Sequence, residues 1–177
     1  MTIDTERLHL REYTWEDRDD LAAIISDPET MRYYPAPYDA AGVDRWIRWN
    51  LNNYRDLGFG LFVIERREDG AFLGDCGITI QIINHKLVAE IGYHLNRRYH
   101  HCGYAAEAAA ACRDWIFTHA PFNTVYSYMN SENTASRRVA ERCGMHFVEE
   151  YEEDGVPHTV MAITRAEWQA LSSSPDE

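Results

Sequence analysis

The segment Glu90–Ala111, with the sequence EIGYHLNRRYHHCGYAAEAAAA, constrains the fold of this chain more than any other part. A strand pattern ends at Leu95, a short basic loop follows, and Gly103 opens an alanine-rich helix that runs to about His119. Another strand pattern covers residues 124–128. Two strands joined through a helix predict a parallel pair, because a hairpin turn cannot connect parallel strands.

The rest of the chain predicts antiparallel hairpins around this parallel pair. Strand patterns cover residues 7–12, 61–65, 73–82, 87–95, 146–151 and 159–164. The sequence Glu68-Asp69-Gly70 is a turn signal between the second and third of these strands. We therefore expect an α+β domain with a mostly antiparallel sheet of about six or seven strands.

Three further helices are expected. The first follows Thr14 and Asp17, whose spacing is close to that of a capping box. The second covers residues 39–57, and the third covers residues 134–143 and ends at Gly144, a usual residue at a helix C-terminus. The apolar stripes are Leu21, Ile24 and Ile25 in the first helix and Val43, Trp46, Ile47 and Leu51 in the second.

The composition is that of one ordinary domain. The chain has 177 residues, and the 45% that are hydrophobic suffice for one substantial core. Aromatic residues make up 12% of the chain, which argues against disorder. Only residues 172–177 read as a frayed tail, so we expect a single domain over residues 1–171.

Charge and cysteine spacing exclude several classes of protein. A net charge of −12 argues against binding to nucleic-acid phosphates, and no apolar run approaches the about 20 residues that a membrane-spanning helix needs. The N-terminal MTIDTERLHLREY carries no apolar signal region, and the four cysteines show no paired spacing. We expect reduced thiols in a cytoplasmic protein that binds neither nucleic acid nor membrane.

The start of the alanine-rich helix has the chemistry of an anion site. Amides of the first helical turn have no partner inside the helix, and the helix dipole adds partial positive charge there. Gly103 lets the backbone approach a ligand closely, and the alanines let the helix lie near the sheet. An ordinary glycine turn is the alternative that this segment leaves open.

A second segment, NTASRRVAERCGM at residues 133–145, carries a hydroxyl on an apolar helix face. Asn133 stands where a helix N-cap is expected. Ser136 shares a face with apolar residues at 139, 140 and 143, and a bond from its hydroxyl back to its own helix is the alternative explanation. Arg138 and Arg142 form another stripe, for which a solvated face is the alternative.

Together the two segments resemble the GCN5-related N-acetyltransferases, and more narrowly the branch with the RimJ- and RimL-like ribosomal-protein N-terminal acetyltransferases. Six stretches carry the resemblance in the family's order: TERLHLREYTWED, MRYYPAPYDAAGVDRWI, LGDCGI, AEIGYHL, GYAAEA and NTASRRVAERCGM. They span nearly the whole chain. The resemblance implies a twisted central sheet with helices on both faces, whose parallel strands splay apart around acetyl-CoA.

The family's pyrophosphate-binding pattern is Arg or Gln, two free positions, Gly, one free position, then Gly or Ala. This chain keeps Gly103 and Ala105 and has His100 at the first position. The resemblance also implies that the strand at residues 93–95 pairs with the pantetheine arm and that Asn133 hydrogen-bonds to it. The expected acetyl-CoA-binding residues are Tyr93, His94, Leu95, Arg98, His100, His101, Cys102, Gly103, Tyr104, Ala105, Asn133, Ser136, Arg138 and Arg142.

Acetyl transfer to an amine needs a proton acceptor, a polarised thioester carbonyl and a proton donor for the leaving thiolate, but no nucleophilic residue. In the family the amine attacks the thioester directly, and a backbone amide of the strand at residues 93–95 polarises the carbonyl. Many relatives have a tyrosine acid at the position that Ala140 occupies here. Ser136 is then the candidate proton donor.

The candidate proton acceptor is Glu90, on the strand that leads to the expected cofactor site. A carboxylate facing solvent is the alternative reading of Glu90, and Glu149 and Glu150 are further candidates.

The run His100-His101-Cys102 raises zinc binding as another possibility. Three adjacent loop residues rarely face one ion and no matching cluster occurs in the sequence, so no metal is expected.

Charge also bears on the acceptor. Residues 97–142 contain six arginines and four acids, for a charge of +2, which leaves −14 on the rest of the chain. Such a surface attracts a cationic acceptor, although acidic surfaces also keep proteins soluble. A protein N-terminus, a polyamine, an aminoglycoside and a small amine are the candidates. We expect the loop at residues 31–38 and the helix at residues 39–57 to line the acceptor cleft, although their aromatic residues could equally belong to the core. The sequence leaves open a second function, in which a catalytically degenerate protein binds CoA as a sensor or interaction module. It also leaves open a homodimer.

Overall fold

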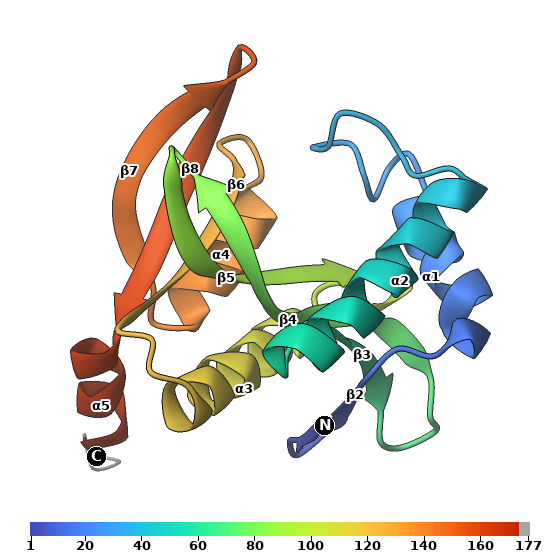
Figure 1. Ribbon diagram of the computed structural model, residues 1–177, viewed down its shortest axis with the longest axis horizontal. Helices are drawn as coiled ribbons and strands as arrows, with labels where there is room; N and C mark the ends of the chain where they lie inside the picture. Colours follow the sequence, from blue (N-terminus) through green and yellow to red (C-terminus); the bar gives the residue numbers. More distant parts are fainter. Residues whose placement is uncertain (174–177) are drawn as a thin grey trace.

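The computed structural model describes residues 1–173, which form one open sheet with helices packed against it (Figure 1). Residues 174–177 lie outside the described part. The strand order across the sheet is β1-β2-β3-β4-β5-β6-β8-β7. The strands are β1 (Thr2–Asp4), β2 (Leu8–Arg11), β3 (Leu61–Arg66), β4 (Phe72–Ile83), β5 (Lys86–Leu95), β6 (Thr124–Asn130), β7 (His146–Glu153) and β8 (Val156–Thr164).

One pair of neighbouring strands is parallel and the other pairs are antiparallel, as the sequence predicts. Strands β5 and β6 pair at a single position, Glu90 with Tyr126. Beyond this position β5 turns away from β6 toward the side of helices α1 and α2 (Figure 1). The splay leaves one edge of β5 open from Ile91 onward, while the other edge stays paired with β4 as far as Leu95.

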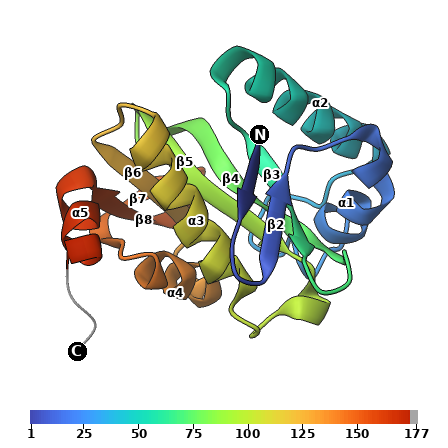
Figure 2. The same cartoon turned by 90° about the horizontal axis from the view of Figure 1, so that it is seen from below.

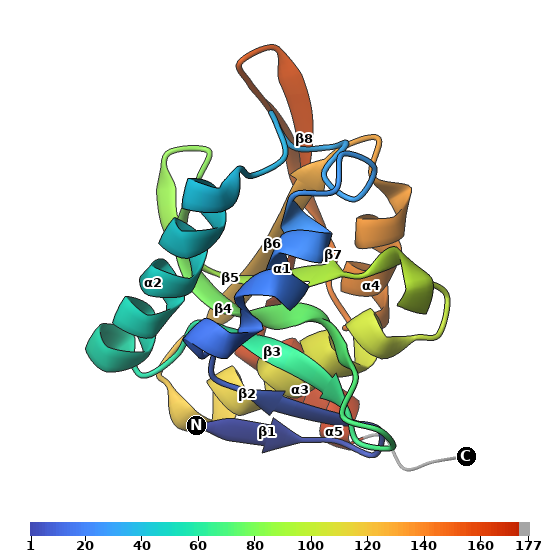
Figure 3. The same cartoon turned by 90° about the vertical axis from the view of Figure 1, so that its right-hand side faces the viewer.

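Helices cover both faces of the sheet (Figures 2 and 3). Helices α1 and α2 lie on one face, and α3 and α4 lie on the other, with α5 beside β8. The helical segments are η1 (Trp15–Asp17), α1 (Arg18–Ile25), α2 (Ala40–Leu57), η2 (Arg97–Tyr99), α3 (Tyr104–His119), α4 (Thr134–Arg142) and α5 (Arg165–Ser173).

Strand alternation divides the core into two clusters. On β3, Phe62 and Ile64 face the cluster beneath α3, whereas Leu61 and Val63 face the cluster beneath α1 and α2. The predicted stripes of α1 and α2 belong to the second cluster. Burial of apolar area at about 25 cal/mol per Å² is the main stabilising contribution of both clusters.

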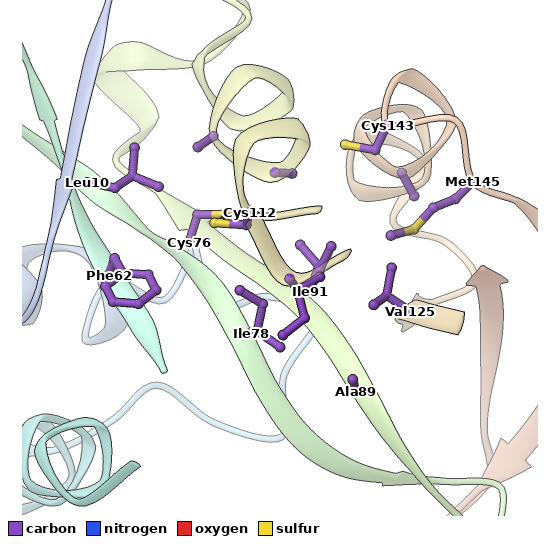
Figure 4. Packing of buried hydrophobic residues seen from close by; sticks show 14 of the residues in the cluster. Leu10, Phe62, Cys76, Ile78, Ala89, Ile91, Cys112, Val125, Cys143 and Met145 are labelled. Atoms are coloured by element: carbon purple, nitrogen blue, oxygen red, sulfur yellow. Dashed lines mark hydrogen bonds between the residues drawn. The ribbon is translucent and has the colours of Figure 1, made fainter. Parts of the chain in front are cut away.

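The alanines of α3 allow close packing on the sheet, as expected. Ala108 and Ala109 are completely buried in the cluster beneath this helix. Cys112 of α3 meets Cys76 of β4, with their sulfur atoms 3.8 Å apart (Figure 4). All four cysteines are free thiols.

Two elements depart from the sequence prediction. Strand β1 (Thr2–Asp4) adds an edge and brings the sheet to eight strands instead of six or seven, and α5 follows directly after β8. The tail expected at residues 172–177 falls partly in α5, and its remainder lies outside the described residues. Within residues 1–173, no helix combines the length and the apolar character needed to cross a membrane.

Candidate active site

The site is built around β5, whose alternating side chains face opposite sides of the sheet. Ile91 is buried beneath α3, and the Tyr93 hydroxyl bonds to Ser136 of α4. Glu90 and His94 face the side covered by α1, α2 and the loop between them, where their side chains meet groups from β4 and that loop. Gly92 lies between them on the same face. The open edge of β5 therefore has one set of polar groups on each side.

Glu90 is buried, with 8% of its surface exposed, so it is not a solvent-facing carboxylate. Its Oε2 accepts a hydrogen bond of 2.9 Å from Thr79 Oγ1, directly across on β4. Burial raises the pKa of Glu90 to about 7, against the Thr79 hydrogen bond and the charge of His94, which lower it. Such a carboxyl group exchanges a proton readily near neutral pH.

Gly92 makes room for this carboxylate. A Cβ atom at position 92 would lie 3.0 Å from both carboxylate oxygens of Glu90. The Glu90 side chain therefore lies along β5 over Gly92, toward His94. Any larger residue at position 92 would displace it.

His94 belongs to a buried hydrogen-bonded cluster around Asp75, which is 1% exposed. Its Nδ1 lies 2.8 Å from Asp75 Oδ1, and its Nε2 lies 2.8 Å from the hydroxyl of Tyr34. The other carboxylate oxygen, Oδ2, accepts from the Tyr13 hydroxyl at 2.8 Å and from Trp46 Nε1 at 3.1 Å. Burial opposes a charge on His94, but the charge and hydrogen bond of Asp75 outweigh it and raise the histidine pKa.

The sequence predicts His94 only as part of the strand that pairs with the cofactor. It does not indicate Asp75, and it places Tyr34 in the loop expected to line the acceptor site without predicting its bond to His94. Asp75 lies in a strand among hydrophobic residues, where a buried carboxylate is costly unless it is paired. That cost is the signal that could have identified it. Tyr34 gives no such signal, because its partner is 60 residues away in the chain.

On the opposite face, Tyr93 and Ser136 bond to each other reciprocally. The Tyr93 hydroxyl donates to the Ser136 carbonyl oxygen at 2.8 Å, and Ser136 Oγ donates to the Tyr93 hydroxyl at 3.2 Å. The hydroxyl of Ser136 is thus held across to β5 and does not bond back to its own helix. Asn133 is the N-cap of α4, as predicted, with its Oδ1 accepting from the Ser136 amide at 3.1 Å.

The loop after β5 leads into α3 through two residues with left-handed backbone. His101 has φ 63° and Gly103 has φ 81°, and α3 begins at Tyr104. A Cβ atom on Gly103 would meet no atom closer than Arg7 Nη2, at 3.5 Å, so the space before the helix is open. The Nε2 atom of His100 lies 3.0 Å from the Leu95 carbonyl oxygen, and this contact ties the loop to the end of β5.

Arg7 braces this loop, a role that the sequence does not reveal. Its Nε donates to Glu107 Oε2 at 2.7 Å and its Nη1 donates to the Cys102 carbonyl at 3.0 Å. The guanidinium also lies over the Tyr104 ring, 4.7 Å from its centre. The ion pair of Arg7 and Glu107 therefore ties the loop to the first turn of α3.

The remaining expected binding residues lie on the surface around the loop. Arg98, His101, Cys102, Arg138 and Arg142 are exposed, while Leu95, Tyr104 and Ala105 are half-buried. Within residues 1–173, no group of three or more His, Cys, Asp or Glu side chains could hold a metal ion.

The alternative proton acceptors are held in other contacts. Glu149 bonds to Lys86 at 3.0 Å and to Asn84 at 2.9 Å, and Lys86 lowers its pKa. Glu150 accepts a bond of 2.9 Å from Ser131. Glu90 is therefore the better placed of the three candidates, because it lies where β5 and β6 part.

The sequence matches the acetyltransferase (GNAT) domain over residues 7–146. The chain belongs to this acetyltransferase family. This GNAT protein is 40% identical over 146 residues to the uncharacterized protein YkkB of Bacillus subtilis (strain 168), covering 81% of this chain and 84% of the relative. It is 34% identical over 137 residues to the uncharacterized N-acetyltransferase p20 of Bacillus licheniformis, covering 76% of each.

Solved structures agree with the family. An acetyltransferase from Agrobacterium tumefaciens superposes with a TM-score of 0.80 at 30% identity, over 92% of this GNAT chain and 94% of that one. Two other structures share the fold. Spermidine N-acetyltransferase from Vibrio cholerae in complex with CoA and spermine has a TM-score of 0.76 at 18% identity, over 93% of this chain and 99% of that one. The ribosomal L7/L12 acetyltransferase RimL has a TM-score of 0.76 at 16% identity, over 93% of this chain and 94% of that one. The protein is an acyltransferase, and its family uses acetyl-CoA as cosubstrate.

Proposed function

We propose that this GNAT protein transfers the acetyl group of acetyl-CoA to a primary amine, and that Glu90 and Ser136 handle protons on opposite sides of the thioester. The observation that carries the proposal is the open edge of β5, which lies between a buried carboxylate with a pKa of about 7 and a hydroxyl held by Tyr93. Glu90 accepts a proton from the amine, and Ser136 donates one to the thiolate.

Acetyl-CoA fits the surfaces described above. Its pyrophosphate would lie against the amides that open α3, where Gly103 leaves space. The pantetheine arm would lie along the open edge of β5 at residues 93–95, with Asn133 and the arginines at 98, 138 and 142 around it. Asn133 Oδ1 is occupied as the N-cap, so its amide nitrogen is the group left for the arm.

The residues around the thioester have separate tasks. Gly92 leaves room for the Glu90 carboxylate to lie along β5, which holds it beside the open edge where the amine and the thioester would meet. An amide of β5 polarises the thioester carbonyl. On the other face, Ser136 turns its hydroxyl from Tyr93 to the leaving sulfur.

The acceptor that we propose is a protein N-terminus or a small cationic amine. A hollow of about 420 Å³ lies in the loop next to the site and is lined by Tyr34, Tyr38, Arg45 and neighbouring loop residues. The rings of Tyr34 and Tyr38 in this hollow suit a cation, and most of the chain's negative charge lies outside residues 97–142. Cytoplasmic location and a homodimer stay predictions.

An amine panel tests the function directly. Acetyl-CoA is mixed with the protein and spermidine, a peptide with a free N-terminal serine, kanamycin or phenethylamine, with free CoA and product mass as readouts. Release of CoA together with an acetylated amine is the expected result. If acetyl-CoA raises the melting temperature but no amine of the panel is acetylated, the alternative of a CoA-binding sensor is favoured.

A further inference from the structure

A chain of hydrogen bonds connects the buried carboxylate of Asp75 to the surface of the acceptor loop. It passes from Asp75 Oδ1 to His94 Nδ1 and from His94 Nε2 to the Tyr34 hydroxyl, with both distances 2.8 Å. Tyr34 is 42% exposed, whereas Asp75 is 1% exposed. One end of the chain is thus fixed in the core, and the other end belongs to a partly exposed residue of the loop beside the proposed acceptor site.

The proposed reaction needs more than one proton acceptor. A primary ammonium ion must lose one proton before its nitrogen can attack the thioester. After the attack, the nitrogen of the tetrahedral intermediate must lose a second proton before it becomes an amide. Glu90 can hold only one of these protons until it exchanges with solvent.

We propose that the Asp75–His94–Tyr34 chain is a second proton acceptor for the acceptor nitrogen, and that the Tyr34 hydroxyl is its point of contact. This inference rests on the function proposed above. It assigns Tyr34 as a catalytic residue, His94 as the group that stores the proton and Asp75 as a positioning residue.

With Asp75 ionised, the hydrogen bonds give the chain one direction of proton transfer. The Asp75 carboxylate can only accept, so His94 Nδ1 carries the proton between them and Nε2 presents a lone pair. The Tyr34 hydroxyl then donates to Nε2, which leaves its own oxygen free to accept from the substrate nitrogen.

One N–H bond of the intermediate breaks and an O–H bond forms at Tyr34, while the original Tyr34 proton forms an N–H bond at His94 Nε2. The intermediate then collapses, its C–S bond breaks, and the thiolate takes one proton from Ser136, the proposed donor. Glu90 and the His94 imidazolium each return one proton to solvent, and the donor that protonated the thiolate takes one back, so one proton is released per turnover.

The groups around His94 favour this use of the ring. Tyr13 and Trp46 both donate to Asp75 Oδ2, so the carboxylate is held with Oδ1 directed at His94. The rings of Trp46 and Tyr34 lie 5.2 Å and 5.4 Å from the His94 ring and fix its plane. The titratable groups that face His94 are Asp75 from β4, Glu90 from β5 and Tyr34 from the loop, and both carboxylates stabilise an imidazolium.

The first test compares Tyr34→Phe with Tyr33→Phe. Both changes remove one hydroxyl from the same loop, but the Tyr33 hydroxyl contacts Arg32. With the amine of the panel that the parent protein acetylates fastest, Tyr34→Phe should lower kcat about 100-fold, a typical effect of losing a general base. The KM for acetyl-CoA should not change, and Tyr33→Phe should keep the parent kcat. An unchanged kcat in Tyr34→Phe would overturn the inference.

The second test is chemical rescue of His94→Ala by free imidazole, which can enter the space left by the ring. Rescue should be saturable, and it should be absent in the double variant His94→Ala/Tyr34→Phe. Equal recovery in the single and the double variant would contradict a path through Tyr34. No recovery in His94→Ala that is still folded by its melting curve would assign His94 a structural role.

A third measurement needs no acceptor. In the ¹⁵N spectrum of the parent protein, neutral His94 should be protonated at Nδ1, and protonation at Nε2 would refute the proposed direction of transfer.

The assays distinguish a failure of the proposed acetyltransferase function from a failure of the proposed proton path through Tyr34. If the parent protein acetylates no amine, the proposed function fails, whereas an active parent with a fully active Tyr34→Phe variant overturns the inference alone.

Discussion

Ser136 has the clearest individual role that can be tested, because its hydroxyl has one partner, Tyr93. If Ser136 protonates the thiolate, Ser136→Ala should lower kcat about 10- to 100-fold, at the low end for a general acid because a thiol with a pKa near 8.5 leaves readily. Acetyl-CoA should bind with nearly unchanged affinity. The measurement is kcat per folded molecule together with a melting curve.

Two controls separate this role from packing. Tyr93→Phe removes the partner of Ser136 but leaves the serine hydroxyl in place, so it should cost less activity than Ser136→Ala. A serine needed only for structure would lower stability by about 1 kcal/mol while kcat of the folded enzyme held. That result would leave protonation of the thiolate to water.

Ionised Glu90 should lower the free energy of unfolding at the pH where it acts as a proton acceptor. Burial raises its pKa from 4.5 to about 7, so the native state holds this proton more tightly than the unfolded chain. Ionised Glu90 therefore costs stability increasingly as the pH rises from about 4.5, and the whole cost is present above about pH 7. Glu90→Gln avoids this cost and keeps an oxygen that can accept from Thr79.

The free energy of unfolding of Glu90→Gln should match that of the parent near pH 4 and exceed it by up to about 3 kcal/mol near pH 8. Urea unfolding at both pH values measures this difference, and acetylation by the variant should be strongly reduced. A variant no more stable than the parent at pH 8 would show that Glu90 is not a buried charge at neutral pH.

At the scale of elements, the start of α3 is where we propose that the cofactor's pyrophosphate binds. Gly103→Val should weaken acetyl-CoA binding, because its side chain would fill the space where the pyrophosphate is proposed to lie. The readout is the cofactor-induced rise in melting temperature, which depends on affinity. Gly70→Val is a matched control, since Gly70 also has a positive φ, of 71°, but lies in the turn between β3 and β4.

Both variants should be destabilised by backbone strain, because valine disfavours a positive φ. Only Gly103→Val should also lose the response to acetyl-CoA. Equal responses in the two variants would refute the placement of the pyrophosphate.

Periodicity and turn signals predict most elements of this fold, because long amphipathic patterns depend on near neighbours in the sequence. The three residues of β1 are too few to show such a pattern, and α5 follows β8 without an intervening turn signal. The candidate site is a different case. Glu90 and Ser136 lie in recognisable segments, but the bond between His94 and Tyr34 depends on how the loop before α2 folds over the sheet.

Across the whole molecule, the splayed strand β5 carries polar groups on both faces of the sheet, to which we assign the two proton transfers. Strand alternation places Glu90 and His94 toward α1 and α2, and it places Tyr93 toward α4. A thioester along the open edge of β5 would then have proton acceptors on the side of the amine and a proton donor on the side of the sulfur. The single bridge between β5 and β6 makes this arrangement possible, because a fully paired strand would have no open edge.

The distribution of charge over the molecule predicts salt dependence. A cationic acceptor approaching the −14 outside residues 97–142 should be attracted over several ångströms, and salt shortens that range from about 10 Å at 0.1 M to about 3 Å at 1 M. Its apparent KM should therefore rise several-fold between about 0.05 and 0.5 M NaCl, with kcat nearly constant. A weakly basic amine that is uncharged at the assay pH is the control, and its KM should change little. If the KM values of both acceptors change equally with salt, the salt acts on acetyl-CoA binding or on folding. A neutral or anionic acceptor that is acetylated fastest would contradict a cationic substrate.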